Sequence, residues 1–84
     1  MGTMKAYVLL NTELGMEPEV IKNLTSVKEI KSCYNLYGIY DIIVEVEADT
    51  MDQVKDIVFN HIRRLEYVKS TITLITYGEP VIND

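Results

Sequence analysis

Two stretches of this 84-residue chain begin and end alike, and each follows a segment with helical spacing of its apolar residues. Residues 31–38 and 69–78 both open with Lys-Ser and close with Tyr-Gly, although the second is two residues longer. A strand pattern also precedes each helical segment. The chain therefore reads as a strand–helix–strand unit present twice, which predicts the element order βαββαβ.

Hydrophobic periodicity gives the individual elements. Residues 4–11 are apolar at both phases of the alternation, which is typical of a strand covered on both faces. Residues 42–48 alternate strictly between apolar and polar, so that strand has one dry face and one wet face. The expected strands are residues 4–11, 30–37, 42–48 and 67–77, the expected helices are residues 17–28 and 51–65, and Gly38-Ile39 forms a short turn that leads through Tyr40-Asp41 into the third strand.

The fold expected from this order is an α+β, ferredoxin-like domain. Right-handed crossovers place the first and third strands centrally, in the sheet order 4-1-3-2, with both helices on one face. Two helices leave the second face of the sheet bare, and that face carries apolar residues. The simplest cover is the sheet of a second copy, so we expect the chain to dimerise through its sheets. Residues 1–84 are expected to be a single domain with a loose tail at 79–84.

The composition limits the classes of protein to which this chain can belong. With 48% hydrophobic and 25% charged residues, the chain resembles ordinary globular proteins. It has no apolar run near the roughly 18 residues of a membrane span and no signal-peptide pattern at its start, so we expect a cytoplasmic protein and no membrane partner. The formal charge of −5, with Arg63-Arg64 as the longest basic run, disfavours direct nucleic-acid binding.

Residues able to perform catalysis or bind a metal are sparse. The single histidine, His61, lies at the edge of the apolar stripe of the second helix, without the nucleophile and orienting group that catalysis needs. The single cysteine, Cys33, cannot form an internal disulfide and is expected to be a buried, inert thiol. The cofactor-binding motifs GxGxxG, Walker A and HExxH are missing from the sequence. We therefore expect no enzyme, no cofactor and no metal site.

The hairpin Tyr37-Gly38-Ile39-Tyr40-Asp41 is the one segment that suggests a ligand. A carboxylate at the mouth of a strand can accept hydrogen bonds from an ammonium group, and the bare glycine backbone lets a small ligand approach. A plain hairpin, in which Asp41 accepts hydrogen bonds from nearby turn amides, is the structural alternative. The residues alone leave both interpretations open.

This hairpin, followed by Ile-Ile-Val-Glu-Val-Glu, resembles the glycine, any residue, tyrosine, aspartate and apolar strand of the Lrp/AsnC (leucine-responsive regulator) family. The likeness is to the C-terminal effector domain of that family, the RAM domain, and it runs from Ala6 to Tyr77. It implies dimerisation through the sheets, rings of dimers, and amino acids bound between dimers near the hairpin. By this resemblance, the effector-site residues are Tyr37, Gly38, Ile39, Tyr40, Asp41, Ser70 and Thr71.

Two of these positions depart from the usual pattern of the family. Tyr37 stands where a small polar residue is frequent, and Ile39 where many members carry a second acid. The strand pattern begins within the first few residues, so the helix-turn-helix half of such regulators is missing from this sequence. The resemblance implies a non-catalytic module for amino-acid binding and oligomerisation, linked to transcription regulation, without its own DNA-binding domain.

Two alternatives remain open. The chain is a purely structural partner of full-length Lrp/AsnC regulators that binds no ligand, or it is a small dimeric enzyme on the same ferredoxin-like scaffold. The expected partners are a second copy, within a ring of dimers, and a small amino acid as effector, with full-length Lrp/AsnC regulators as a further partner.

Overall fold

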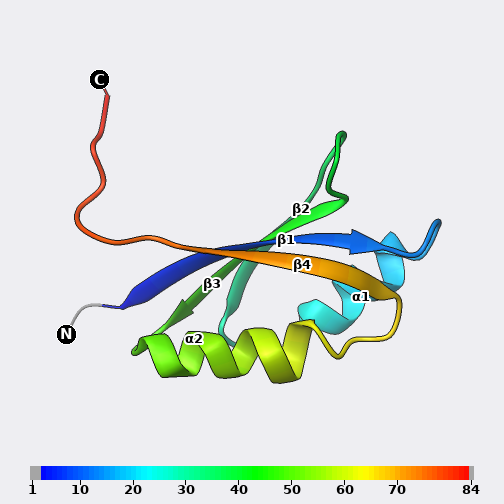
Figure 1. The fold of residues 1–84 in the computed structure, drawn as a ribbon, viewed down its shortest axis with the longest axis horizontal. Coiled ribbons are helices and arrows are strands. Elements are labelled where there is room, and N and C mark those ends of the chain that lie inside the picture. Colours follow the sequence, from blue (N-terminus) through cyan, green and yellow to red (C-terminus); the bar gives the residue numbers. More distant parts are fainter. Residues whose placement is uncertain (1–2, 84) are drawn as a thin grey trace.

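Four strands form one antiparallel sheet, and the helices lie against a single face of it (Figure 1). The computed structural model describes residues 3–83. The sheet order β2-β3-β1-β4 is the expected order 4-1-3-2 counted from the other edge, which confirms the ferredoxin-like α+β prediction. The elements are β1 (Met4–Thr12), α1 (Glu17–Leu24), β2 (Ile30–Asn35), β3 (Ile42–Ala48), α2 (Met51–Ile57), the π-helical turn η1 (Val58–Ile62) and β4 (Val68–Ile75).

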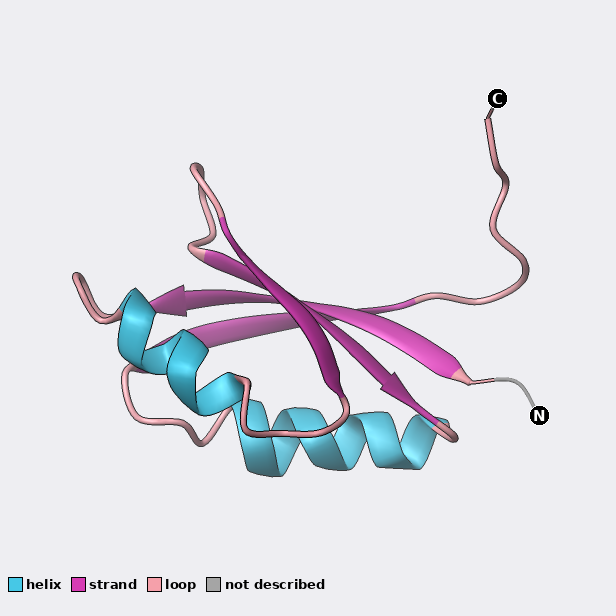
Figure 2. Cartoon of the chain, turned by 180° about the vertical axis from the view of Figure 1, so that it is seen from behind, coloured by secondary structure: helices cyan, strands magenta, loops and turns pink. Residues whose placement is uncertain are grey.

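The hydrophobic core lies between the sheet and the helices (Figure 2). Alternate residues of β1 and β3 are buried, and the register pairs Val8 with Val44 and Ala6 with Val46 across the two central strands. The alternation read from residues 42–48 is therefore confirmed. The buried apolar side chains are Ala6, Val8, Leu10, Val20, Leu24, Ile42, Val44, Val46, Ala48, Val54, Ile57, Val58 and Ile62.

Helix α1 ends at Leu24 rather than at the expected Lys28. The hydroxyls of Thr25 and Ser26 donate to carbonyls of the preceding turn, at 2.9 and 2.8 Å. These bonds satisfy carbonyl groups that another helical turn would otherwise have used. Val27 still packs partly buried against the core, which explains why the apolar spacing continues beyond the helix.

Helix α2 begins after a side-chain N-cap, Thr50. Thr50 has an extended backbone, and its Oγ1 accepts a hydrogen bond from the Gln53 amide at 3.1 Å. The Gln53 side chain in turn accepts from the Asp49 amide at 2.8 Å, so two backbone donors at the helix start are satisfied reciprocally.

Replacing Thr50 with alanine is expected to lower the free energy of unfolding by about 1 kcal/mol, because the Gln53 amide loses its acceptor. Thr50→Ser keeps the hydroxyl and serves as the matched control. Urea denaturation followed by circular dichroism measures both. An alanine variant as stable as the serine variant would contradict the role assigned to this cap.

The second helix widens into the π-helical turn η1 before it ends. The amide of Arg63 donates to the carbonyl of Val58 at 2.8 Å, five residues earlier. The helical stretch stops at Ile62 instead of reaching the expected Leu65. Within residues 3–83, neither helix combines the length and the apolar character that crossing a bilayer requires.

The connection between β2 and β3 is longer than the short turn expected at Gly38-Ile39. Strand β2 stops at Asn35, and residues 36–41 form a loop. The Leu36 amide donates to the Asp41 carbonyl at 2.9 Å and closes the base of this loop. Gly38 has a φ of +144°, a conformation that L-residues rarely adopt, so the extended pairing cannot continue through it.

Strand β4 is shorter than expected at both ends. Tyr67 has a φ of +77° and lies outside the strand, which begins at Val68. The strand ends at Ile75, and residues 76–83 are exposed. The Thr76 amide still donates to the Lys5 carbonyl at 3.0 Å, so contact with β1 extends one residue further.

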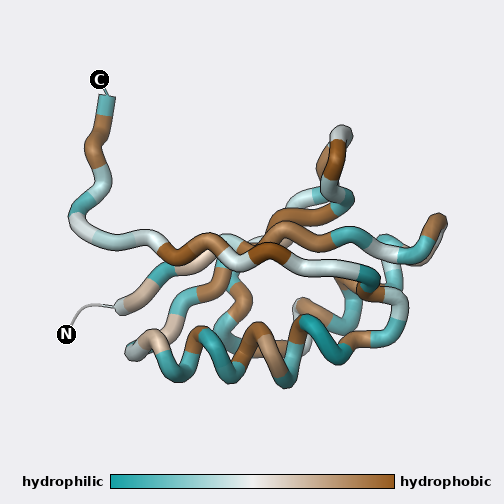
Figure 3. The backbone as a smooth tube through the Cα atoms, viewed as in Figure 1, coloured by the Kyte–Doolittle hydropathy of each residue, from teal (hydrophilic) through white to brown (hydrophobic). Residues whose placement is uncertain are grey.

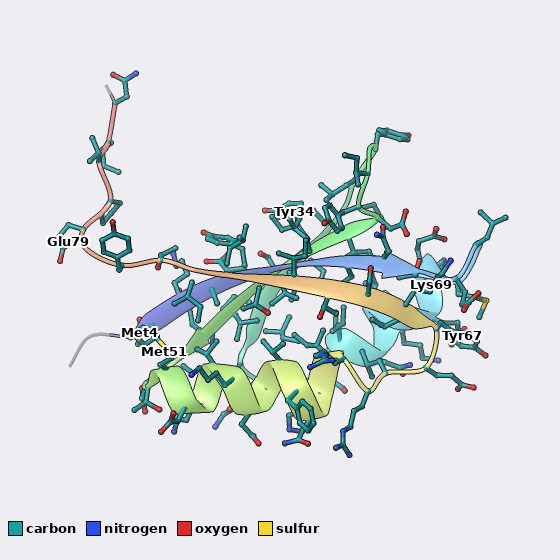
Figure 4. The ribbon with its side chains drawn as sticks, in the orientation of Figure 1. Met4, Tyr34, Met51, Tyr67, Lys69 and Glu79 are labelled. Atoms are coloured by element: carbon teal, nitrogen blue, oxygen red, sulfur yellow. The ribbon has the colours of Figure 1, made fainter. Side chains whose placement is uncertain are left out.

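The face of the sheet that carries no helix is rich in apolar side chains. Figure 4 shows Tyr34 on this side, away from α2. The strand register places the other members beside it: Ile43 lies opposite both Tyr34 and Leu9, and Leu9 lies opposite Ile72. We call this surface the open face; its apolar residues are Tyr7, Leu9, Tyr34, Ile43, Ile72 and Leu74.

Candidate functional site

The hairpin loop 36–41 rises on the side of the open face and is anchored at its base by Asp41 (Figure 1). The Asp41 amide donates to the carbonyl of Leu10 at 2.8 Å. The Asp41 carboxylate oxygen Oδ2 accepts from the amide of Thr12, also at 2.8 Å. The carboxylate therefore binds a backbone amide of β1 rather than the nearby turn amides of the plain-hairpin alternative, and it lies half-buried at the end of the sheet.

The tip of the loop is directed into solvent. The side chains of Tyr37 and Ile39 are exposed, and a Cβ atom on Gly38 would meet no atom within 4 Å. Tyr40 is half-buried. Figure 3 shows apolar residues at this tip, away from the core. The structure thus separates the five hairpin residues into an exposed tip and a base, Tyr40 and Asp41, that packs near the sheet.

Asn11 and Ser70 form a polar pair at the end of the open face. The register pairs Asn11 with Ser70, and the Asn11 amide nitrogen Nδ2 donates to Ser70 Oγ at 3.3 Å. Asp41 bonds through its amide to Leu10 and through its carboxylate to Thr12, the two neighbours of Asn11 in β1, so the base of the hairpin loop lies next to this pair. Asn11 was not among the site residues predicted from sequence, because only the pairing of β1 with both neighbouring strands reveals its position.

Thr71 is not part of this pair. It pairs with the buried Leu10, so its side chain lies on the helix face of the sheet while Ser70 lies on the open face. The two adjacent residues named by the family resemblance therefore point in opposite directions. Only Ser70 shares a face with Asn11.

A groove runs along the outer edge of β4, where this strand passes α2 and η1. Two cavities of about 520 and 340 Å³ share Val58, Arg63 and Thr73 and form this groove, which we call the β4 groove. Ser70 and Thr71 line its wider part, and no residue of the hairpin loop contributes to either cavity. The remaining lining residues are Val54, Lys55, Phe59, Val68, Lys69 and Ile75.

A charged cluster occupies the other end of the open face. Lys5 Nζ lies 3.2 Å from Glu45 Oε2 and 3.7 Å from Glu47 Oε2, and the Ser32 hydroxyl donates to Glu45 Oε1 at 3.1 Å. The hydrogen bond with Glu45, aided by the charge of that carboxylate, raises the pKa of Lys5 above its ordinary value. Both acids on this part of β3, Glu45 and Glu47, are therefore paired with a cation.

Cys33 and His61 take no part in these features. Cys33 lies half-buried against the core, and burial raises the pKa of its thiol, so the unreactive neutral form predominates at neutral pH. His61 is exposed and lines a shallow hollow with Asp52 and Asp56 on the flank of the helix away from β4.

Comparison with known proteins identifies the relatives of this domain. The sequence profile of the Lrp/AsnC ligand-binding domain matches residues 5–84. The regulatory protein AsnC of Escherichia coli K12 is 28% identical over 65 residues, which cover 77% of this chain and 43% of AsnC. The chain therefore spans less than half the length of this curated relative.

Two solved structures are similar over nearly their whole length. The hypothetical protein PHS023 from Pyrococcus horikoshii has a TM-score of 0.84 and 36% identity, and the match covers 90% of this chain and 92% of that one. The structure of FFRP-DM1 has a TM-score of 0.85 and 35% identity, with 88% and 99% covered. Since the family profile extends over the whole sheet and all the helices, the chain belongs to the Lrp/AsnC ligand-binding domain family.

Proposed function

We propose that this domain binds a small amino acid at the hairpin end of its open face and pairs with a second copy through that face, as a non-catalytic module of transcription regulation. The observation that carries the proposal is the Asp41 carboxylate, held against the end of β1 at the base of the hairpin loop, in a ligand-binding family. The curated relative is a regulatory protein, which favours a regulatory role over an enzymatic one.

The chemistry of Asp41, Asn11 and Ser70 supports an amino-acid ligand. The Thr12 amide binds Asp41 Oδ2 and so fixes the orientation of the carboxylate. The same carboxylate can accept charge-assisted hydrogen bonds from an ammonium group. Asn11 and Ser70 add an amide and a hydroxyl, which can bond to a carboxylate. The exposed backbone at Gly38 lets a ligand approach from the solvent side.

The proposed pairing through the open face follows from its exposed apolar area. Tyr34 is 63% exposed and Leu74 is 50% exposed, although both lie in strands of the sheet. A second sheet packed on this face would bury the apolar residues of the open face in both copies at once. A domain of this size buries only roughly 60% of its unfolded surface, so the additional burial stabilises it substantially.

Isothermal titration calorimetry with the twenty amino acids tests ligand binding. We expect heat of binding with at least one of them, and about 10- to 100-fold weaker binding by Asp41→Asn, which keeps an acceptor for Thr12 but removes the charge. Asp52→Asn, an exposed carboxylate on α2, is the matched control and should bind like the wild type. The absence of heat from all twenty, in a correctly assembled protein, would overturn the proposed ligand.

A second function is favoured by one observation: the exposed Ile39 occupies the position where many family members carry an acid. In this function the chain binds no ligand and assembles with full-length regulators of the same family. Mixing the purified chain with such a regulator and measuring the mass of the complexes discriminates the two. A mixed assembly supports this second function, and two separate homo-oligomers contradict it.

A further inference from the structure

The β4 groove is a cationic hollow in an acidic chain. The described residues that line it include Lys55, Arg63 and Lys69 but no aspartate or glutamate. This is unusual in a protein with 13 acidic and 8 basic residues and a formal charge of −5. Within residues 3–83, the salt bridges are those of Lys5 alone, so none of the three cations of the groove has an acidic partner. Their charge is available to an anion from solution.

Arg63 is the central cation of this groove. It lines both cavities, and its guanidinium carbon lies 5.6 Å from the centre of the Phe59 ring. Contact with the ring restricts the side chain, so less conformational entropy is lost when its N–H groups bond to an anion. The planar guanidinium matches the two oxygens of a carboxylate. The groove therefore presents a donor arranged in advance for a carboxylate.

The narrower cavity combines these cations with an apolar floor. Val54 and Val58 contribute to it from the second helix, and Ile75 from β4. Phe59, at the same cavity, is 47% exposed, and Ile75 is half-buried. A ligand with an apolar body would remove this surface from water, which stabilises the complex by about 25 cal/mol for each Å² buried. An inorganic anion would satisfy the cations but leave the apolar surface exposed.

Thr73 adds a hydroxyl to the same cavity. Its side chain lies on the helix face of the sheet, because it pairs with the buried Val8, and it is half-buried. The hydroxyl can donate to a ligand oxygen. An ammonium group, in contrast, would find no carboxylate among the lining residues and would lie close to like charges. The groove therefore suits an acid that has no ammonium group, rather than an amino acid.

The opposite flank of α2 has the reverse chemistry. The shallow hollow there is lined by Glu29, Asp52 and Asp56 together with His61, and the described residues around it include no lysine or arginine. Because the two flanks of one helix differ in the sign of their charge, an anionic ligand is directed to the flank that faces β4.

We propose that the narrower part of the β4 groove binds a small apolar carboxylate without an ammonium group, such as a branched-chain or aromatic 2-oxo acid. Arg63 and Lys55 would bond to the carboxylate, and Thr73 would donate to a neighbouring oxygen. The apolar body would pack on Phe59 and Ile75. The cavity volume of about 340 Å³ lies within the range of roughly 300–1,000 Å³ that is typical of small-molecule sites.

This site is distinct from the proposed amino-acid site and does not depend on it. No residue of the hairpin loop lines either cavity. Pairing through the open face would use Ile72 and Leu74, whose side chains lie on the opposite side of β4 from Thr73, so the groove stays accessible in the pair. One domain would thus bind two chemically different ligands at separate places.

Isothermal titration calorimetry on the full chain tests the proposal, with 4-methyl-2-oxopentanoate and phenylpyruvate as probes. We expect at least one of them to bind, and Arg63→Gln to weaken its binding by about 10- to 100-fold, through the loss of a charge-assisted hydrogen bond. Arg64→Gln is the matched control. Arg64 lies 4.7 Å from the centre of the same ring but lines neither cavity, so its loss should weaken binding less than about threefold.

Amide chemical shifts measured by NMR locate the bound probe. The probe that binds should shift the amides of Val58, Arg63 and Thr73, whereas L-leucine, which has the carbon skeleton of the first probe, should leave them unchanged. Acetate should bind at least about tenfold more weakly than the probe, because it lacks most of the apolar body.

Four outcomes would overturn the proposal. They are the absence of binding by both probes in a folded protein, equally tight binding of acetate, equal effects of Arg63→Gln and Arg64→Gln, and shifts confined to the hairpin loop. Circular dichroism of both variants confirms that a loss of binding does not come from a loss of the fold.

Discussion

The double variant Ile72→Glu with Leu74→Glu is expected to be a folded monomer at concentrations where the wild type forms the proposed pair. Ile72 and Leu74 are 42% and 50% exposed in the single chain, so the monomer tolerates polar groups there. In the proposed pair each substitution occurs twice, which would bury four carboxylates without partners. The dissociation constant should rise by more than about 1,000-fold, because each buried, unpaired charge costs several kcal/mol.

Sedimentation equilibrium measures this change, and Val81→Glu, at another exposed apolar position, is the matched control. The control should remain a pair. A double variant that still pairs, with an unchanged circular dichroism spectrum, would contradict pairing through the open face.

Leu10→Ala is expected to cost about 2–5 kcal/mol of unfolding free energy. Leu10 is fully buried and lies in the central strand β1, paired with Ile42 of β3 and Thr71 of β4. The whole domain is worth on the order of 4–13 kcal/mol, so this single change removes a large share of its stability.

Leu74→Ala is the matched control, since it removes the same atoms from the opposite face of the sheet. In a monomeric background it should cost less than about 1 kcal/mol, because half of the side chain already contacts water. Chemical denaturation of both variants gives the comparison. Equal losses from the two would contradict a core confined to the helix face.

The order of the elements and the packing of both helices on one face of the sheet could be predicted from sequence, because they follow from hydrophobic periodicity. The alternation of apolar and polar residues at 42–48, and the apolar residues at both phases of 4–11, depend only on which faces of each strand are buried. The ends of the elements were harder to predict. The hydroxyls of Thr25 and Ser26, and the backbone at Gly38 and Tyr67, end their elements through local bonds and dihedral angles that apolar spacing does not record.

The candidate site could be predicted only in part, for a related reason. The sequence pointed to Asp41 through its place after a glycine and a tyrosine, and the family resemblance added Ser70. Neither could reveal Asn11, which bonds to Ser70 and lies between the two residues of β1 that bond to Asp41. Thr71 was grouped with Ser70 as a neighbour in sequence, but neighbours in a strand face opposite sides.

The hydrogen bond from the Glu13 amide to the Tyr67 carbonyl has a mechanical consequence. It joins the turn after β1 to Tyr67, the residue immediately before β4, which has an uncommon positive φ. Thr12, whose amide binds Asp41, is the next residue back along β1. A displacement at the base of the hairpin would therefore act on this bond and on the pairing of Thr12 with Val68 beside it, so the turn and the start of β4 must move together or these contacts must break.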